Sequence, residues 1–366
     1  MSPPCVVIAC GGTGGHLLPG LAVAEELKRR GKGICLLLSE KEIDRTALEG
    51  EGEYPWETLP TMGWPGPFST NTPIFFWRLW RSRRSCLSLF GRLQPGAVLG
   101  MGGFLSAVPL FVAGERNIPT LLHESNAVPG LVTRLFCRKV DRVLLGFAQC
   151  RALLGGASAV VTGTPLRERL RKIPRGEAAD ALGLSADRPT ILILGGSQGA
   201  RAVNRLLQEA VGALARSSCP VQVLHLSGLA DREACLASYR AHRIPAIVES
   251  FSHRMDLFYS LADVAVARAG AATLAEVAFY GLPSILIPFP YAADNHQRAN
   301  AKAFVEAGAS LSYDQGALSG EVLATAVEEI LNDARKRQRM SEAAASLARP
   351  DAARLVAEEV ERCMRR

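Results

Sequence analysis

Residues 5–16, CVVIACGGTGGH, decide the fold class, because a short apolar strand runs directly into a glycine-rich turn. The same arrangement returns in TILILGGSQGA at residues 190–200. Helical patterns follow both turns, at about 17–30 and 200–216. Strands that alternate with helices are typical of parallel βαβ units. The sequence therefore predicts an α/β protein in which one architectural unit is used twice.

Strand candidates fill both halves of the chain. They are CVVIAC, ICLLLS, AVLG, PTLLHE, RVLLG and AVVTG in the first half, and TILILG, VQVLHLS, AIVES, VAVARAG and SILIPF in the second. A chain of 366 residues is too long for one ordinary core. We predict two Rossmann-like, doubly wound parallel-sheet domains, at 1–164 and 165–350, with a helix at 351–366 that packs on the first. Ligands are expected in a cleft faced by the strand carboxyl ends.

Composition narrows the class of protein. Hydrophobic residues make up 48% of the chain and charged residues 21%, as in folded soluble proteins. No apolar run approaches the roughly 20 residues that cross a bilayer, and no signal-peptide pattern is present, so we expect a cytoplasmic protein. Nine cysteines without a C-x-x-C pair argue against metal and disulfide sites. The formal charge of +7 indicates an anionic partner without choosing among nucleic acid, membrane and phosphorylated substrate.

The turn GGTGGH has a clear chemical use. Its glycines let the backbone approach a ligand, and the following helix offers unpaired N–H groups and a partial positive charge. A tight connection without a ligand is the plainer alternative. A dinucleotide-binding loop fits poorly, because Leu17 stands where G-x-G-x-x-G needs its last glycine. Glu40 could still bind a ribose, so a nicotinamide enzyme stays open, whereas no P-loop motif occurs.

Further motifs follow other predicted strands. GMGGF at 100–104 and HESN at 123–126 place glycines, Glu124 and Asn126 with His16 at the carboxyl edge of one sheet. In the second half, ARAGAATLAE at 267–276 leads a strand into a helix whose N-terminus suits a diphosphate. Glu276 in this helix would bind a ribose, or it only complements the helix dipole. A polar cluster at 294–297 follows another strand.

Together these motifs resemble the MurG glycosyltransferases of peptidoglycan synthesis. The matching runs are GGTGGH (11–16), GMGGF (100–104), HESN (123–126), GTPLR (163–167), GGSQGAR (195–201), RAGAATLAE (268–276) and HQRAN (296–300). The resemblance implies a GT-B fold. It also implies inverting transfer of N-acetylglucosamine from UDP-N-acetylglucosamine to the 4-hydroxyl of the muramyl sugar of undecaprenyl-linked lipid I, yielding lipid II. It further implies no cofactor, no nucleic-acid partner, a role in cell shape and division, and peripheral attachment to the cytoplasmic face of the cell membrane, where other cell-wall synthesis proteins are potential partners.

The resemblance also implies roles for single residues. Donor-binding residues would be Thr13, Gly14, Gly15, Asn126, Arg167, Ser197, Ser252, Ala271, Ala272, Thr273, Glu276 and Gln297. The acceptor side would comprise Gly102, Gly103 and Phe104. His16 and Glu124 are the candidates for the catalytic base, and Glu124 could instead orient the histidine. Ser125, Ser252 and Ala269 depart from the family's usual residues.

An inverting transfer needs a base and stabilisation of the departing UDP. Asp-x-Asp, by which many transferases hold a metal, is absent from the sequence. Helix N-termini with Arg167 and Ser197 would offset the charge instead, since removing such a preorganised donor costs about 2.7–4 kcal/mol. We therefore predict no metal requirement. His16 suits base work, because a helix N-terminus favours the neutral imidazole; alternatively it only orients the acceptor.

The segment NTPIFFWRLWRSRRSCLSLFGRL, residues 71–93, predicts an amphipathic helix. At about 100° per residue, one face is expected to meet the core; it comprises Phe76, Leu79, Trp80, Leu87 and Phe90. The opposite side carries Arg78, Arg81, Arg84 and Arg92, with Ile74 and Trp77 among them. Apolar groups beside arginines suit an anionic membrane interface. We expect reversible attachment through Ile74, Trp77, Arg78 and Arg81, with a merely solvated basic face as the alternative.

Three other functions compete with this interpretation. Another GT-B enzyme would act on a different lipid or a natural product, but it should lack the combined GMGGF and HESN runs. A nicotinamide oxidoreductase is disfavoured by the failed glycine fingerprint. A catalytically inactive scaffold that binds a nucleotide sugar is disfavoured because His16, Glu124 and Glu276 are all present.

Overall fold

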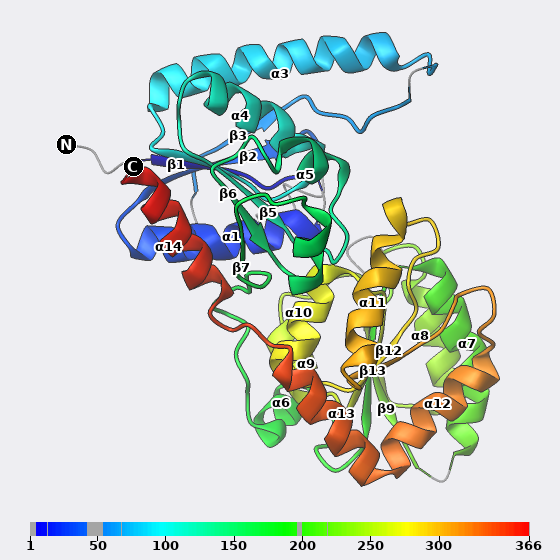
Figure 1. Cartoon of the computed structure of the whole chain (residues 1–366). Coiled ribbons are helices and arrows are strands. Elements are labelled where there is room, and N and C mark those ends of the chain that lie inside the picture. The colour runs from blue at the N-terminus through cyan, green and yellow to red at the C-terminus, as the bar shows by residue number, and fades with distance from the viewer. Residues whose placement is uncertain are drawn as a thin grey trace. The chain divides into compact units, whose positions relative to one another are not determined.

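The chain forms two compact units (Figure 1). A computed structural model describes residues 5–12, 14–41, 54–66, 68–195, 200–217 and 219–365. The first unit comprises residues 1–168 and 349–366, and the second comprises 169–348. The first unit extends past residue 164 because Thr164 and Arg167, which follow its last strand, are buried.

The first unit is built on a parallel sheet of seven strands in the order β3-β2-β1-β4-β5-β6-β7. The strands are β1 (Cys5–Ala9), β2 (Gly33–Ser39), β3 (Trp56–Leu59), β4 (Ala97–Gly100), β5 (Thr120–Glu124), β6 (Arg142–Leu145) and β7 (Ala159–Val161). Their nearly continuous apolar runs are typical of strands buried on both faces. The sequence pattern missed β3, because this edge strand is short and its first two residues are exposed.

Helices cover both faces of this sheet (Figure 1). They are α1 (Gly14–Arg29), α3 (Thr72–Leu93), α4 (Gly103–Glu115), α5 (Leu131–Phe136), the 3-10 helix η1 (Ala148–Leu153) and α14 (Ala352–Met364). On one face, Val356, Ala357 and Val360 of α14 enter the same apolar cluster as Leu21 of α1. An ion pair between Arg30 and Glu361, at 3.1 Å, adds to this contact. The C-terminal helix thus belongs to the first unit.

The buried face of α3 differs from the prediction. Phe76 and Trp80 are 57% and 58% exposed, so the expectation that they meet the core was wrong. Phe75, Cys86 and Leu89 are buried instead, and Phe90 is buried as expected. The helix carries aromatic residues on both sides, so hydrophobicity alone does not fix its rotation. Small side chains such as Ser82, which is buried, allow close packing but contribute little to an apolar pattern.

The second unit repeats the arrangement with six parallel strands in the order β10-β9-β8-β11-β12-β13. They are β8 (Thr190–Leu194), β9 (Gln222–Leu226), β10 (Ala246–Glu249), β11 (Val264–Ala267), β12 (Ser284–Leu286) and β13 (Ser310–Ser312). In chain order within each unit, both sheets read 3-2-1-4-5-6, with β7 added in the first. This is the doubly wound nucleotide-binding order, so the predicted fold class is confirmed.

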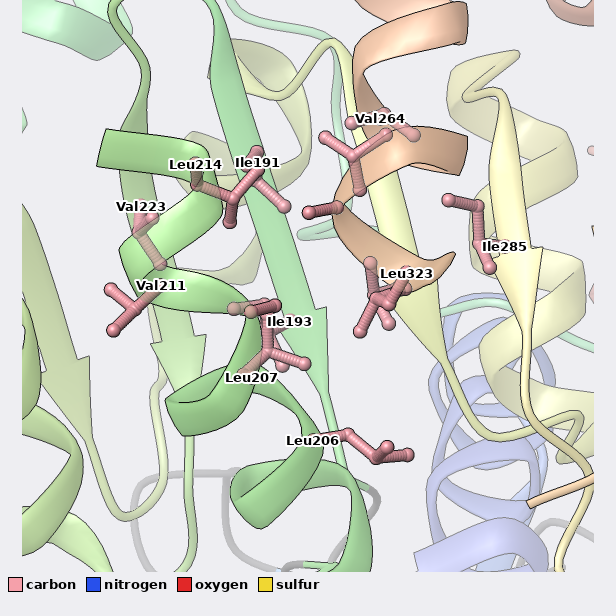
Figure 2. Packing of buried hydrophobic residues seen from close by; sticks show 14 of the residues in the cluster. Ile191, Ile193, Leu206, Leu207, Val211, Leu214, Val223, Val264, Ile285 and Leu323 are labelled. Atoms are coloured by element: carbon pink, nitrogen blue, oxygen red, sulfur yellow. The ribbon is translucent and has the colours of Figure 1, made fainter. Parts of the chain in front are cut away.

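The helices of the second unit enclose its sheet. They are α6 (Arg175–Leu182), α7 (Arg201–Arg216), α8 (Arg232–Ala241), α9 (Met255–Leu261), α10 (Ala271–Tyr280), η2 (Ala293–Asn295), α11 (His296–Glu306), α12 (Gly320–Asn332) and α13 (Ala334–Ser346). Figure 2 shows Ile191 and Ile193 of β8 between Leu207 and Val211 of α7 and Leu323 of α12. All five side chains are almost completely buried, and they form part of the core of the second unit.

Candidate functional site

His16 lies in the first turn of α1, and its ring packs against the two glycines at the N-terminus of α4. A Cβ added to Gly102 would lie 3.2 Å from His16 Nε2, and one added to Gly103 would lie 3.1 Å from its Cε1. Both glycines have positive φ angles, 96° and 68°, which L side chains rarely adopt. The motif GMGGF therefore provides a surface on which the imidazole rests.

The sheet order brings these residues together. β1 pairs with β4, with Ala9 opposite Gly100, so the segments that follow the two strands leave the same edge side by side. The chain changes direction across the sheet at this pair, because β2 lies beyond β1 and β5 beyond β4. Ligands of open α/β sheets bind at such a switch point. The predicted association of His16 with Gly102 and Gly103 thus has a topological cause.

Glu124, at the end of β5, is engaged by its own loop. Its Oε1 accepts hydrogen bonds from the backbone N–H and the side-chain amide of Asn126, at 3.0 and 3.1 Å. Its Oε2 accepts from Gly130 N–H at 2.9 Å and from the Thr133 hydroxyl at 2.6 Å. The residue is only 5% exposed. This carboxylate holds together the loop between β5 and α5, a role that the HESN motif by itself does not reveal.

His123 precedes Glu124 in β5 and is fully buried. Its Nε2 lies 2.9 Å from the carbonyl oxygen of Gly163, and its Nδ1 lies 3.2 Å from Ser125 Oγ. Burial lowers the pKa of this imidazole, although the Gly163 carbonyl opposes the shift. Ser125, one of the departures from the family pattern, therefore takes part in a buried network that includes the segment before Arg167.

The remaining predicted residues of the first unit have simpler surroundings. Gly14 and Gly15 begin α1, and Arg167 is buried on the segment after β7. The ring of Phe104 lies 6.4 Å from that of Phe75, edge to face. Thr13 and, in the second unit, Ser197 lie outside the described residues.

In the second unit, α10 presents its N-terminus at the end of β11. Gly270 is its N-cap and has no side chain that could accept hydrogen bonds from the first turn. Ala271, Ala272 and Thr273 therefore offer backbone N–H groups and the positive end of the helix dipole, which suit a diphosphate. The side chain of Asn300 donates to the Ala269 carbonyl at 3.0 Å and fixes the preceding backbone.

Glu276 lies on the second turn of α10 and is held by Tyr259 of α9. The Tyr259 hydroxyl donates to Glu276 Oε2 at 2.6 Å. The Tyr259 ring is 2% exposed and stacks on Tyr280, with centroids 4.8 Å apart and 15° between planes. Burial, with Glu276 nearby, raises the pKa of Tyr259 well above its ordinary value, so the phenol remains a donor. No sequence motif indicates this partner, which lies 17 residues upstream.

Gln297 belongs to a segment that Arg268 supports. Gln297 Oε1 accepts from Phe289 N–H at 2.9 Å, which commits its oxygen to the backbone. Arg268, which is buried, donates to the Ile287 carbonyl at 2.9 Å and to Gln315 Oε1 at 2.6 Å. Its guanidinium also lies 5.5 Å from the centroid of the Phe289 ring. The RAGA run therefore contributes an arginine that positions the loop after β12.

Ser252 lies in a turn of the second unit. Ser252 is buried, and its Oγ accepts from Arg254 N–H at 3.2 Å, closing a turn before α9. Within the described ranges, no group of three or more His, Cys, Asp or Glu side chains is arranged to hold a metal ion. The part of the chain that the structure describes also contains no helix with the length and hydrophobicity to span a bilayer.

Comparisons with known proteins agree with this arrangement. The N-terminal domain model of glycosyltransferase family 28 matches residues 6–145, and its C-terminal domain model matches residues 190–356. A protein from Pelobacter propionicus is 36% identical over 97% of this chain and 98% of its own length. It is named UDP-N-acetylglucosamine--N-acetylmuramyl-(pentapeptide) pyrophosphoryl-undecaprenol N-acetylglucosamine transferase. A Bacillus licheniformis protein of the same name is 32% identical over 95% of both chains. The crystal structure of Acinetobacter baumannii MurG superposes with a TM-score of 0.75, at 27% identity, covering 98% of this chain and 99% of that one.

Proposed function

The chain belongs to the MurG family of glycosyltransferases, and on that basis we propose which of its residues bind the substrates and which one removes the proton during transfer. It is an N-acetylglucosamine transferase of peptidoglycan synthesis, which transfers the sugar from UDP-N-acetylglucosamine to lipid I and forms lipid II. Relatives that are 32–36% identical over nearly the whole chain share this one name. A different acceptor, a nicotinamide reaction and an inactive scaffold are therefore without support.

His16 is the proposed base, and its seat on Gly102 and Gly103 is the observation that carries this assignment. The neutral imidazole takes the proton of the acceptor 4-hydroxyl while the hydroxyl oxygen attacks the anomeric carbon of the donor. The bond from that carbon to the UDP oxygen breaks, with inversion. Glu124 serves this step indirectly, because both of its oxygens already accept hydrogen bonds from the loop that it holds.

The departing UDP is stabilised by the chain's own donors. The N–H groups of Ala271, Ala272 and Thr273 face the diphosphate at the start of α10, and Arg167 and Ser197 add to them. Glu276 accepts hydrogen bonds from the ribose hydroxyls, and the backbone at Ser252 contacts the uracil. Gly14, Gly15, Thr13, Asn126 and Gln297 complete the proposed donor contacts. Because these groups offset the developing charge, no metal ion is required.

Turnover with a soluble acceptor tests this proposal. Purified protein, labelled UDP-N-acetylglucosamine and a short-chain lipid I analogue should give transfer in the presence of EDTA. His16→Ala should lower kcat by about 10²–10⁴-fold, with donor binding unchanged. His242→Ala is the matched control, because His242 is exposed on the second unit and hydrogen-bonds Ser238. Activity that EDTA abolishes and a divalent ion restores would refute metal independence, and an active His16→Ala would move the base elsewhere.

The exposed side of α3 is the proposed site of attachment to the cytoplasmic face of the membrane. Ile74 and Trp77 are exposed as predicted, and Phe76 and Trp80 extend the apolar surface beyond the prediction. The Arg81 guanidinium lies 5.3 Å from the centroid of the Trp77 ring. Arg78 contributes less, because it lies 3.5 Å from Glu40 and donates to the Thr61 carbonyl. Aromatic and cationic groups together suit an anionic interface.

Trp77→Glu should reduce binding to liposomes that contain anionic lipid and leave turnover of the short-chain acceptor unchanged. Leu153→Glu is the control, because Leu153 is 56% exposed, against 51% for Trp77, but lies on η1. Equal liposome binding by Trp77→Glu and the unchanged protein would exclude this surface. Lipid I and the anionic membrane are thus the proposed partners, and other cell-wall synthesis proteins would meet the enzyme there.

A further inference from the structure

A cavity of ≈ 390 Å³ lies between β3 and α3 in the first unit, and it shares no residue with the proposed catalytic groups. Its volume is within the range of small-ligand pockets. The polar lining consists of Arg81, Arg84, Ser85, Ser88 and Arg92 from α3 and Glu57 and Thr58 from β3. Three arginines against one glutamate leave the cavity positively charged. Nothing in the proposed transfer reaction uses this charge.

The three arginines have different surroundings. Arg92 lies 2.5 Å from the carboxylate of Glu57. Arg81 and Arg84 instead face aromatic rings, at 5.3 Å from the Trp77 centroid and 5.8 Å from the Trp80 centroid. In the described part of the chain, neither of these two guanidinium groups forms an ion pair with a carboxylate. Their charge is therefore available to an anion from outside the chain.

The donors also have a suitable geometry. A guanidinium that lies against an aromatic ring keeps the N–H groups at its edge for a second partner. Spacings of three or four residues connect positions 81, 84, 88 and 92, and likewise 81, 85, 88 and 92, so these side chains share one face of α3. Two serine hydroxyls between arginine forks can donate to several oxygens of one group. A phosphate, with its tetrahedral oxygens and its charge, matches such a donor set better than a single carboxylate does.

We propose that this cavity binds a phosphate monoester or diester. The inference rests on the membrane attachment proposed above for its position, because Trp77 and Trp80 lie one to two turns before Arg84 on the same helix. A phosphate of a lipid headgroup would sit in the cavity while the exposed rings enter the apolar layer. A soluble phosphate would use the same donors. Without a bound anion, the Glu57 carboxylate pairs with Arg92, so it would compete with an incoming phosphate.

Two variants with opposite expected signs test the site. Arg84→Gln should weaken phosphate binding about fivefold, since one basic residue near an anionic group is worth ~1 kcal/mol. Glu57→Gln should strengthen binding severalfold, because it removes the competing carboxylate. Arg83→Gln is the control: it makes the same charge change on the same helix, but Arg83 pairs with Glu115 and does not line the cavity. A variant that merely misfolds cannot produce the gain expected of Glu57→Gln.

The experiment has two arms. In the first, inorganic phosphate is titrated at constant ionic strength, and the indole N–H shift of Trp80 is followed by NMR. In the second, binding to vesicles of phosphatidylcholine alone is compared with binding to vesicles that also contain phosphatidylglycerol. Variant effects in the first arm establish the site without any membrane. Variant effects confined to the second arm establish it as a lipid-headgroup site.

The two proposals can fail separately. Arg84→Gln behaving like Arg83→Gln in both arms, with no gain in Glu57→Gln, would overturn the phosphate site and leave only diffuse attraction. Phosphate binding with these variant effects, but no binding to either vesicle, would keep the site and refute membrane attachment through α3.

Discussion

The two glutamates near the carboxyl edges of the two sheets are used in opposite ways. Glu124 in the first unit accepts four hydrogen bonds, from Asn126 and Gly130 in the loop after β5 and from Thr133 in the first turn of α5. Glu276 in the second unit is half-buried and is steadied by the Tyr259 hydroxyl, which reaches it from a different helix. One carboxylate holds the backbone of a loop, and the other is the proposed acceptor for the ribose hydroxyls.

The partners of the oxygens distinguish the structural carboxylate from the one proposed to bind a ligand. A carboxylate whose two oxygens are both engaged by backbone N–H and hydroxyl donors gains little from leaving them, because each buried donor would lose its partner. Glu276 is instead oriented by the hydroxyl of a buried phenol, and we propose that it accepts hydrogen bonds from the ribose.

Replacement of Glu124 should have the largest effect. Glu124→Ala leaves buried donors without an acceptor and should lower the free energy of unfolding of the first unit by about 4 kcal/mol. Glu124→Gln keeps one acceptor oxygen and should cost about half as much. Transfer activity should fall along with stability in both variants. All four tryptophans, at positions 56, 64, 77 and 80, lie in the first unit, so urea unfolding followed by tryptophan fluorescence reports this unit selectively.

Glu115→Gln is the control, since Glu115 pairs with Arg83 at the surface, where ion pairs contribute little. If Glu124→Gln keeps full stability but loses its activity and the acidic limb of its pH–rate profile, Glu124 is itself the base. The contrast between the two glutamates would then be broken.

A buried histidine in the second unit should make stability depend on pH. His225 of β9 lies between Tyr239 and Asn204, at 3.0 Å from each, and burial lowers its pKa to about 4. The unfolded chain therefore binds more protons than the folded chain between about pH 6.5 and 4. Stability should be fully present above pH 6.5 and should fall as the pH drops through this window, by at most about 3 kcal/mol.

Urea unfolding followed by circular dichroism, at several pH values, measures this loss. His225→Gln should show a smaller fall over the same pH range, because glutamine does not titrate. An NMR titration should show His225 neutral well below pH 6. An ordinary histidine pKa at this position, or equal pH dependence in the variant, would contradict the prediction.

The smallest effect is expected at Tyr259. Tyr259→Phe removes the hydroxyl that orients Glu276 and should weaken binding of UDP-N-acetylglucosamine about fivefold, or ~1 kcal/mol. It should also reduce the preference for UDP over its 2′-deoxy analogue, which a general loss of stability would not do. Tyr280→Phe is a close control, since Tyr280 stacks on Tyr259 but donates to the Arg171 carbonyl. Isothermal titration calorimetry measures both ligands. Equal selectivity in both variants and the unchanged protein would argue against a positioning role.

Much of the fold follows from the sequence because it depends on local patterns. Apolar strands followed by glycine turns predicted the parallel sheets of both units, and their order is the doubly wound one. Prediction failed where the local signal is weak. β3 and β13 are short strands at the sheet edges, so they lack a long apolar run. The rotation of α3 was wrong at Phe76 and Trp80, because an aromatic side chain fits both a core and an exposed interface.

The site shows the same limit. His16, Gly102 and Gly103 could be associated from the sequence, because strand ends in a parallel sheet meet at one edge. The hydrogen bond from Thr133 to Glu124, and that from Tyr259 to Glu276, join residues from separate elements. No spacing rule within one helix or strand reports such a pair, so the different uses of the two carboxylates became visible only in three dimensions.

The position of α14 has a consequence for how the protein is made. The first unit begins with β1, but Val356, Ala357 and Val360, which bury part of its core, follow the second unit in the chain and are therefore synthesised after it. During translation, the apolar surface of the first unit that α14 later covers thus stays exposed while the whole second unit is synthesised. Apolar surface exposed for that long is a target for chaperones and a risk for aggregation. Nascent chains that stop before residue 352 should therefore bind chaperones through their N-terminal half, and emergence of α14 from the ribosome should end that binding.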